Sequence, residues 1–259
     1  MARLIFLGTG AALPTAQRGN TALAVSGPDP NQWLQIDCGG DTYRALLRAS
    51  IVADGVRDLL ITHAHIDHIG GLPSLIESFR LGGRQAPLRI LALPEVVPVV
   101  LSLLDLYRYE LTLDTWPFGI TIDALEPGQD FTLAGIAART ERMDHALPSV
   151  GVRLELPRGP VCYSCDTQPT PALPALGREA TLLITECTFL AGHEVAARHS
   201  RHMTAVEAGE QATAASARAL ALVHLGMGDG WSAEEARTQA ASAFSGSVLI
   251  PNDGDALDV

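Results

Sequence analysis

The stretch His63-Ala64-His65-Ile66-Asp67-His68 decides how this 259-residue sequence folds and which chemistry it can support. It follows the apolar segment Asp58 to Thr62, which we predict to be a strand, and it precedes the pair Gly70-Gly71. Alternate side chains of an extended segment point to the same side, so the first two histidines can converge on one cation. A turn after them would direct the aspartate and the third histidine towards a second cation.

These residue types are natural metal ligands. Imidazole and carboxylate groups bind zinc, and a site that keeps one position open leaves room for water. The stretch also lies in a loop at the end of a strand, where functional sites usually lie. The alternative is four solvated polar residues, but three histidines and an aspartate within six residues rarely arise in that way. The stretch therefore predicts a metal site.

Composition indicates a globular protein rather than a disordered or membrane protein. Apolar residues make up 47% of the chain and charged residues 18%. No uninterrupted apolar run reaches membrane-spanning length. The segment Met1 to Leu7 is too short for a secretory signal, and the four cysteines form no disulfide framework. We therefore expect a cytoplasmic protein with buried cysteines and no membrane partner.

The net charge bears on the class of partner. The formal charge is −11, and all 18 basic side chains are arginine. Such a surface repels polyanions at long range, which disfavours broad nucleic-acid binding but leaves room for a local basic groove. No linker or repeat is visible, so we predict a single domain over residues 1–259.

Hydrophobic periodicity and turn residues predict an α/β protein. Expected strands cover residues 3–7, 21–25, 33–36, 58–62, 88–93, 120–125, 131–139, 150–156, 161–164, 182–185, 220–225 and 247–251. Helices are expected over residues 41–49, directly after Gly70-Gly71, and over residues 96–107. In the first of these, Leu46 and Leu47 are expected in the core. Two more begin at the capping signals Thr204-x-x-Glu207 and Ser232-x-x-Glu235. This order suits two sheets packed face to face with helices outside.

The motif HxHxDH at residues 63–68 resembles that of the metallo-β-lactamase superfamily. Further stretches resemble the ribonuclease Z and small-phosphodiesterase branch; they are Phe6 to Gly10, Asp37 to Gly39, His145 to Arg153, Tyr163 to Thr167, Thr185 to Phe189, His202 to Thr204 and Asp253-Gly254. The resemblance implies an αβ/βα four-layer sandwich of two mixed sheets with helices outside. It also implies a metal-dependent hydrolase.

The same resemblance implies a ligand set for two zinc ions, with manganese or iron as alternatives. The first ion would be held by His63, His65 and His145, and the second by Asp67, His68 and His224, with Asp166 bridging both. Taken alone, three of these have simpler interpretations: His145 as a loop histidine, Asp166 as a turn residue and His224 as a core histidine. Asp67 and His202 are the catalytic candidates.

His202 lies just before the capping signal at Thr204, and its counterpart in ribonuclease Z enzymes lies beside the scissile phosphate. The resemblance implies that it stabilises the transition state or protonates the leaving oxygen. Glu186 could orient a metal ligand, or it could have only a structural role near the end of the sheet. His193 and His199 are near in sequence but match no motif, and we expect both at the surface.

One difference from these relatives concerns the substrate. Only 20 residues, Ala146 to Cys165, separate His145 from Asp166, whereas transfer-RNA-processing ribonuclease Z enzymes carry a long RNA-gripping arm there. The resemblance to relatives without an arm, which include phosphodiesterases of cyclic esters, favours a small or medium-sized phosphate diester. Alternatives are transfer-RNA 3′ maturation, lactone, ester or sulfate-ester hydrolysis, and a non-enzymatic metal-binding protein. Relatives often dimerise, so a homodimer is a further alternative.

Overall fold

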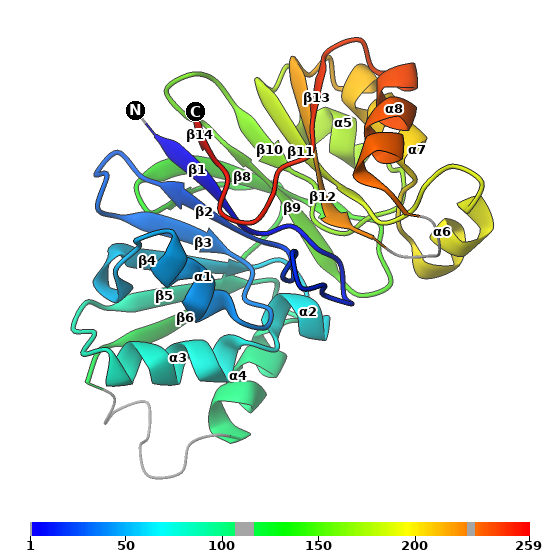
Figure 1. Cartoon of the computed structure of the whole chain (residues 1–259). Helices are drawn as coiled ribbons and strands as arrows, with labels where there is room; N and C mark the ends of the chain where they lie inside the picture. The colour runs from blue at the N-terminus through cyan, green and yellow to red at the C-terminus, as the bar shows by residue number, and fades with distance from the viewer. Residues whose placement is uncertain (1, 107–116, 227–230) are drawn as a thin grey trace.

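The computed structural model describes residues 2–106, 117–226 and 231–259. Over these residues the chain forms two mixed sheets that pack face to face, with helices on both outer faces (Figure 1). This arrangement is the αβ/βα sandwich that the resemblance implied, so the predicted fold is confirmed. None of the helices in the described part of the chain is long and apolar enough to cross a membrane.

The first sheet has the order β14-β1-β2-β3-β4-β5-β6. Strands β14, β1, β2 and β3 pair antiparallel, and β3 to β6 pair parallel. Helices α3 and α4 lie on its outer side (Figure 1). The elements of this half are β1 (Arg3–Gly8), β2 (Ala22–Ser26), β3 (Trp33–Ile36), α1 (Thr42–Arg48), η1 (Ala53–Gly55), β4 (Val56–Ile61), α2 (Ile66–Ile69), α3 (Leu72–Leu81), β5 (Leu88–Ala92), α4 (Val97–Leu106), β6 (Ile120–Ala124) and the C-terminal β14 (Ala256–Asp258).

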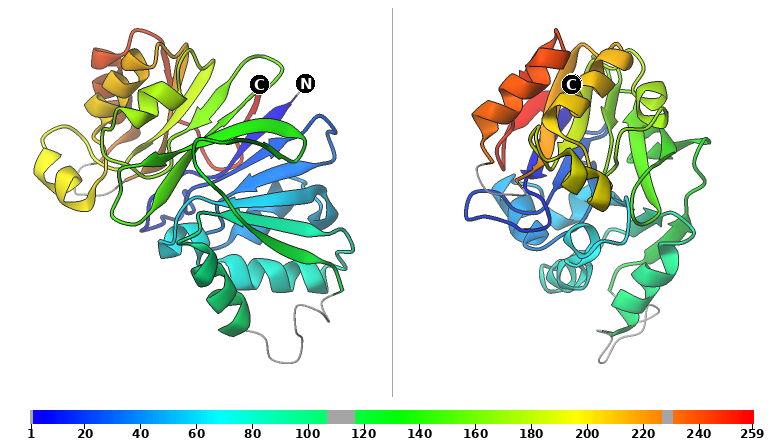
Figure 2. Two further views of the ribbon diagram at one scale, coloured as in Figure 1. Left: turned by 180° about the vertical axis from the view of Figure 1, so that it is seen from behind. Right: turned by 90° about the vertical axis from the view of Figure 1, so that its right-hand side faces the viewer.

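The second sheet has the order β13-β12-β11-β10-β9-β8-β7 and repeats this plan. Strands β7 to β10 pair antiparallel, and β10 to β13 pair parallel. Figure 2 shows its helices α7 and α8 on the opposite side of the sandwich from α3 and α4. The elements of this half are β7 (Asp130–Leu133), β8 (Ile136–Met143), β9 (Ser149–Leu154), β10 (Val161–Tyr163), α5 (Ala172–Leu176), β11 (Leu182–Cys187), α6 (Glu194–Ser200), α7 (Ala205–Ala214), β12 (Ala219–Leu225), α8 (Ala233–Ala243) and β13 (Ser247–Leu249).

The core lies between the two sheets and under the helices. Both sheets contribute to one buried apolar cluster, and a second cluster fills the space between the second sheet and helices α5, α7 and α8. All six residues of β11 are buried, as expected for a parallel strand covered on both faces. Leu46 of α1 is buried as predicted, whereas Leu47 is 57% exposed, so its assignment to the core was wrong.

Two helix starts follow the predicted capping chemistry. The Thr204 hydroxyl accepts from the Glu207 backbone N–H, while the Glu207 carboxylate accepts from the Thr204 N–H, which completes a capping box at α7. The Ser232 hydroxyl likewise accepts from the Glu235 N–H at α8. All four cysteines are buried and free.

The single strand expected over 131–139 is wrong. The chain turns back at Ala134-Gly135, and the two arms pair as β7 and β8. Both turn residues have positive φ, 47° and 80°, which is the geometry of a two-residue hairpin. The Ala-Gly pair lacks the usual Asn-Gly or Asp-Gly signal, so the sequence reads as a continuous strand.

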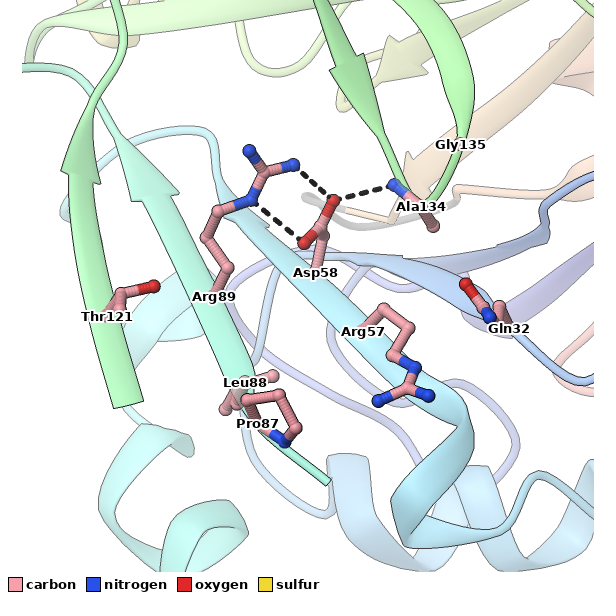
Figure 3. A pocket seen from close by; sticks show the side chains of 9 residues that line it. All are labelled: Gln32, Arg57, Asp58, Pro87, Leu88, Arg89, Thr121, Ala134 and Gly135. Atoms are coloured by element: carbon pink, nitrogen blue, oxygen red, sulfur yellow. Dashed lines mark hydrogen bonds and ion pairs between the residues drawn. The ribbon is translucent and has the colours of Figure 1, made fainter. Parts of the chain in front are cut away.

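Asp58, near the start of β4, ties the two sheets together (Figure 3). Its carboxylate accepts from Arg89 Nε at 3.0 Å and Arg89 Nη2 at 2.6 Å, and also from the Ala134 N–H at 2.6 Å. Arg89 also donates to the Thr132 carbonyl at 2.7 Å. A shallow pocket of about 310 Å³ beside this bridge is also lined by Arg57 and neighbouring residues. The pocket lies at the opposite end of β4 from the histidine stretch.

Candidate metal centre

The predicted ligands meet where strands of both sheets end. His63 lies two residues after β4, and His145 lies two residues after β8. Asp166 follows β10, and His224 is the last residue but one of β12. Parallel sheets commonly place their sites at the carboxyl ends of their strands. The side chains of His63, His145, Asp166 and His224 are almost completely buried, so the site is built into the sandwich rather than added on its surface.

One group of donor atoms belongs to His63, His65, His145 and Asp166, and these atoms all lie within 4.8 Å of one another. His65 Nδ1 is 3.0 Å from both His63 Nε2 and His145 Nε2. Asp166 Oδ2 is 3.7 Å from His63 Nε2 and 4.0 Å from His145 Nε2. Three imidazole nitrogens and one carboxylate oxygen therefore face a common point.

A second group shares Asp166 with the first and adds Asp67, His68 and His224. His68 Nε2 and His224 Nε2 each lie 3.3 Å from Asp67 Oδ2. The same two nitrogens lie 3.3 and 3.2 Å from Asp166 Oδ2. Helix α2, which begins directly after His65, turns the chain so that Asp67 and His68 face this second point.

The donor atoms of both groups fit cations better than they fit one another. His68 Nε2 and Asp166 Oδ1 are buried and have no hydrogen-bond partner. Buried polar atoms normally have a hydrogen-bond partner. Unpaired buried nitrogen and oxygen atoms that converge on one place therefore indicate that a bound group belongs there. Imidazole nitrogens and carboxylate oxygens are the donors that zinc prefers. The residues present therefore fit a metal centre.

The charges of the site also favour a bound cation. Burial lowers the pKa of His63, His65 and His145, and nearby imidazoles add to this effect, which keeps these rings in the neutral form that binds metals. Burial would raise the pKa of Asp166, but His224 and His68 outweigh it and hold the pKa well below its usual range. The shared carboxylate is therefore ionised.

Each fully buried histidine of the two groups has a partner for its second ring nitrogen. His68 Nδ1 is 2.7 Å from Asp37 Oδ2, and His224 Nδ1 is 2.9 Å from Thr188 Oγ1. His145 Nδ1 donates to the Arg201 carbonyl at 3.0 Å. Such contacts fix the ring orientation and the tautomer, and they make a ligand more basic.

Four of the nine described non-glycine residues with positive φ lie at the site or next to its ligands. Asp37, Cys165, Arg201 and His224 are all left-handed non-glycine residues, with φ between 54° and 64°. L-residues adopt this conformation at a cost of roughly 1–2 kcal/mol each. Strain of this kind persists where the surrounding structure imposes it, and it commonly marks functional sites.

His202 lies between α6 and α7 beside the second group of donors. Its ring stacks on that of His224 with centroids 5.3 Å apart, and its Nδ1 donates to Glu186 Oε1 at 2.8 Å. The Thr188 hydroxyl donates to Glu186 Oε2 at 2.7 Å. Burial would lower the pKa of His202, but Glu186 outweighs it and raises this pKa to about 9. The ring is therefore held with Nε2 available to carry a proton.

The structure brings all the predicted site residues together, with His202 beside the ligand candidates. His193 and His199 are exposed, as expected. Sequence reasoning left Glu186 undecided and did not find Thr62, Thr188 or the Arg201 carbonyl as partners of the ligand rings. Only the stretch Thr185 to Phe189 gave a signal, because it resembles a family motif.

Comparisons with known proteins agree with this geometry. The family described as Anti-Pycsar protein Apyc1 matches residues 2–212. A ribonuclease Z of Halorubrum lacusprofundi is 29% identical over 99% of this chain and 97% of its own length. That alignment runs over 308 positions, more than the 259 residues of this chain, so the relative carries segments that this chain lacks.

Two solved structures support the fold. The metallo-β-lactamase fold protein YhfI of Bacillus subtilis is similar with a TM-score of 0.85 and 23% identity, over 100% of both chains. The short form of human tRNase Z is similar with a TM-score of 0.80 and 23% identity, over 99% of both chains. The chain is a metal-dependent hydrolase of the ribonuclease Z-like branch of the metallo-β-lactamase superfamily, and within it the chain belongs to the Apyc1 family.

Proposed function

We propose that this hydrolase is a phosphodiesterase with a two-zinc centre, acting on small or medium-sized phosphate diesters. The observation that carries the proposal is the position of Asp166 Oδ2, which lies within 4.0 Å of His63, His68, His145 and His224 nitrogens from both donor groups. A carboxylate shared in this way suits two cations about 3.5–4 Å apart.

The ligand roles follow from the two groups. His63, His65 and His145 would hold one ion and Asp67, His68 and His224 the other, with Asp166 between them. Two zinc ions bound there would activate a water molecule as nucleophile and offset negative charge on the phosphate. Manganese or iron could occupy the same donors, because imidazole and carboxylate ligands also suit these metals.

Two side chains would move protons. The Asp67 carboxylate is buried and ionised, since the nearby His224 and His68 rings outweigh the effect of burial and hold its pKa well below the usual range. It can accept the proton that the attacking water loses. His202, held by Glu186 through Nδ1, can donate from Nε2 to the leaving oxygen.

The size of the substrate follows from the interval between His145 and Asp166. Its 20 residues form strands β9 and β10 and the turn between them, which leaves no segment for a protruding arm. The net charge of −11 further disfavours a long polyanion. Small diesters, including cyclic phosphate esters, avoid both restrictions.

The test is hydrolysis by protein loaded with zinc or manganese. Bis(p-nitrophenyl) phosphate and 3′,5′-cyclic nucleotides serve as diester substrates, and lactones, thioesters and aryl sulfates as alternatives. We expect turnover of the diesters, which Asp166→Asn abolishes. No diester turnover, together with good turnover of one of the other classes, would reject the proposal.

Transfer-RNA 3′ maturation is the second candidate, because the relative from Halorubrum lacusprofundi is a ribonuclease Z that aligns over almost the whole chain. In this case another subunit of an oligomer would supply the surface that binds the RNA. A gel assay on precursor transfer RNA at low salt decides between the two. Cleavage at the 3′ end would favour this candidate, and uncut precursor would exclude it.

A further inference from the structure

Asp37 connects the two halves of the centre, although it belongs to neither donor group. It follows strand β3 directly and is completely buried. Its Oδ1 accepts from the Thr62 N–H at 2.8 Å. Its Oδ2 accepts from the Thr62 hydroxyl at 2.9 Å and lies 2.7 Å from His68 Nδ1. A carboxylate accepts in all three contacts, so His68 must carry its proton on Nδ1.

Thr62 extends this network to the other group. Its Oγ1 lies 3.1 Å from His63 Nδ1. A hydroxyl has one proton, and this one is donated to Asp37, so Oγ1 is left to accept from His63 Nδ1–H. His63 and His68 therefore both keep Nδ1 protonated and Nε2 free. Their Nε2 atoms face different groups: that of His63 lies 3.0 Å from His65 Nδ1, and that of His68 lies 3.3 Å from Asp67 Oδ2.

The backbone holds Asp37 in place at a cost. Its φ of 64° is left-handed, which aspartate tolerates better than most residues. The Asp37 N–H donates to the Leu60 carbonyl at 2.8 Å, and its carbonyl accepts from Gln35 Nε2 at 2.9 Å. The next residue, Cys38, donates its N–H to the His68 carbonyl at 2.7 Å. Strain maintained by so many contacts points to a role for the carboxylate.

We propose that Asp37 is a positioning residue that couples the two metal positions, directly through His68 and through the Thr62 hydroxyl to His63. This inference rests on the proposed two-ion centre. With an ion at His63, the His63 Nδ1–H would stay on Thr62, the Thr62 hydroxyl would stay on Asp37, and Asp37 would orient His68 for the second ion. The two ions would therefore bind cooperatively, and both would bind more weakly when the Asp37 carboxylate is lost.

The test measures metal binding rather than activity. Metal-free full-length protein is titrated with zinc against a chromophoric chelator of known affinity, and metal content is measured after dialysis. Asp37→Asn keeps the size and tolerates left-handed φ, but its amide has one oxygen, so it cannot accept both at the Oδ1 position from the Thr62 N–H and at the Oδ2 position from Thr62 Oγ1 and His68 Nδ1. Thr62→Val removes the hydroxyl that links Asp37 to His63 and keeps the backbone N–H bond to Asp37, whereas Thr62→Ser keeps the hydroxyl. The matched control is Thr140→Val. Thr140 lies on β8, and its hydroxyl is buried and has no hydrogen-bond partner.

We expect Asp37→Asn to weaken both binding constants, by roughly 10–100-fold each, the effect typical of residues that orient metal ligands. Thr62→Val should weaken one constant by a similar factor and abolish cooperativity. Thr62→Ser should restore both, and Thr140→Val should leave both unchanged. If Asp37→Asn does not fold by circular dichroism, the three threonine variants still decide the question.

Three results would overturn the inference: Thr62→Val behaving like Thr140→Val, Asp37→Asn weakening a single constant, or wild-type protein that binds one ion. The proposed function fails separately. Wild-type protein that binds two ions cooperatively and hydrolyses no diester would reject the phosphodiesterase and leave the coupling intact.

Discussion

Replacing His202 by asparagine separates its proposed catalytic role from any structural one. Asparagine places an amide N–H close to where Nδ1 donates to Glu186, so the buried contact can be kept. Even without it, the Glu186 carboxylate would retain donors from Thr167 N at 3.2 Å, Met203 N at 3.2 Å and Thr188 N at 3.1 Å. The substitution should therefore change stability and zinc content little.

The expected loss concerns proton donation to the leaving oxygen. General acid catalysis contributes roughly 10²–10⁴-fold, which corresponds to about 3–5 kcal/mol of activation free energy. The full loss should appear with a 3′,5′-cyclic nucleotide, whose leaving group is a poor alkoxide. Bis(p-nitrophenyl) phosphate releases a stabilised phenolate that needs little help, so its kcat should fall much less.

The assay compares kcat for both substrates in the wild type, His202→Asn and His199→Asn, all loaded with zinc to equal content. His199 is an exposed histidine of α6 and serves as the matched control, with unchanged kcat. Equal losses on the two substrates would refute the general-acid role and leave His202 as a binding or structural residue. Full activity of His202→Asn on the cyclic nucleotide would remove it from the mechanism.

Further predictions concern the metal ions and the fold. Asp166→Asn should lose at least one ion per chain in elemental analysis, because both donor groups share this carboxylate; retention of two ions would contradict a bridging role. Asp58→Ala should lower the free energy of unfolding in urea by about 2–3 kcal/mol, since it removes the ion pair with Arg89 of the same sheet and a charged hydrogen bond from Ala134 of the second sheet. The exposed Asp130→Ala should change it by less than about 0.5 kcal/mol, and equal effects would refute this. Gly39→Ala should reduce zinc content, because its Cβ would overlap the backbone carbonyl of a predicted ligand, whereas the uncrowded Gly119→Ala should not.

Local chemistry made much of this protein predictable from sequence. The spacing of His63, His65, Asp67 and His68 indicated a metal site, because ligands close in sequence need only one strand end and one helical turn to converge. The capping box at Thr204 marked the start of α7 for a similar reason, since its hydrogen bonds span three residues. His145, Asp166 and His224 came from the family resemblance rather than from any local pattern.

Tertiary structure decided what depends on distant parts of the chain. The partners of the ligand rings are distant in sequence: Asp37 lies 31 residues from His68, and Arg201 lies 56 residues from His145. Asp37 stands in a stretch that resembles a family motif, but no local pattern indicates which ring it contacts. The hairpin at Ala134-Gly135 was missed because its left-handed turn is imposed by strand pairing and by Asp58 rather than by turn residues. The sequence identifies residues able to bind a metal, whereas the packing of the two sheets orients their rings, because orientation is set by contacts between segments far apart in the sequence.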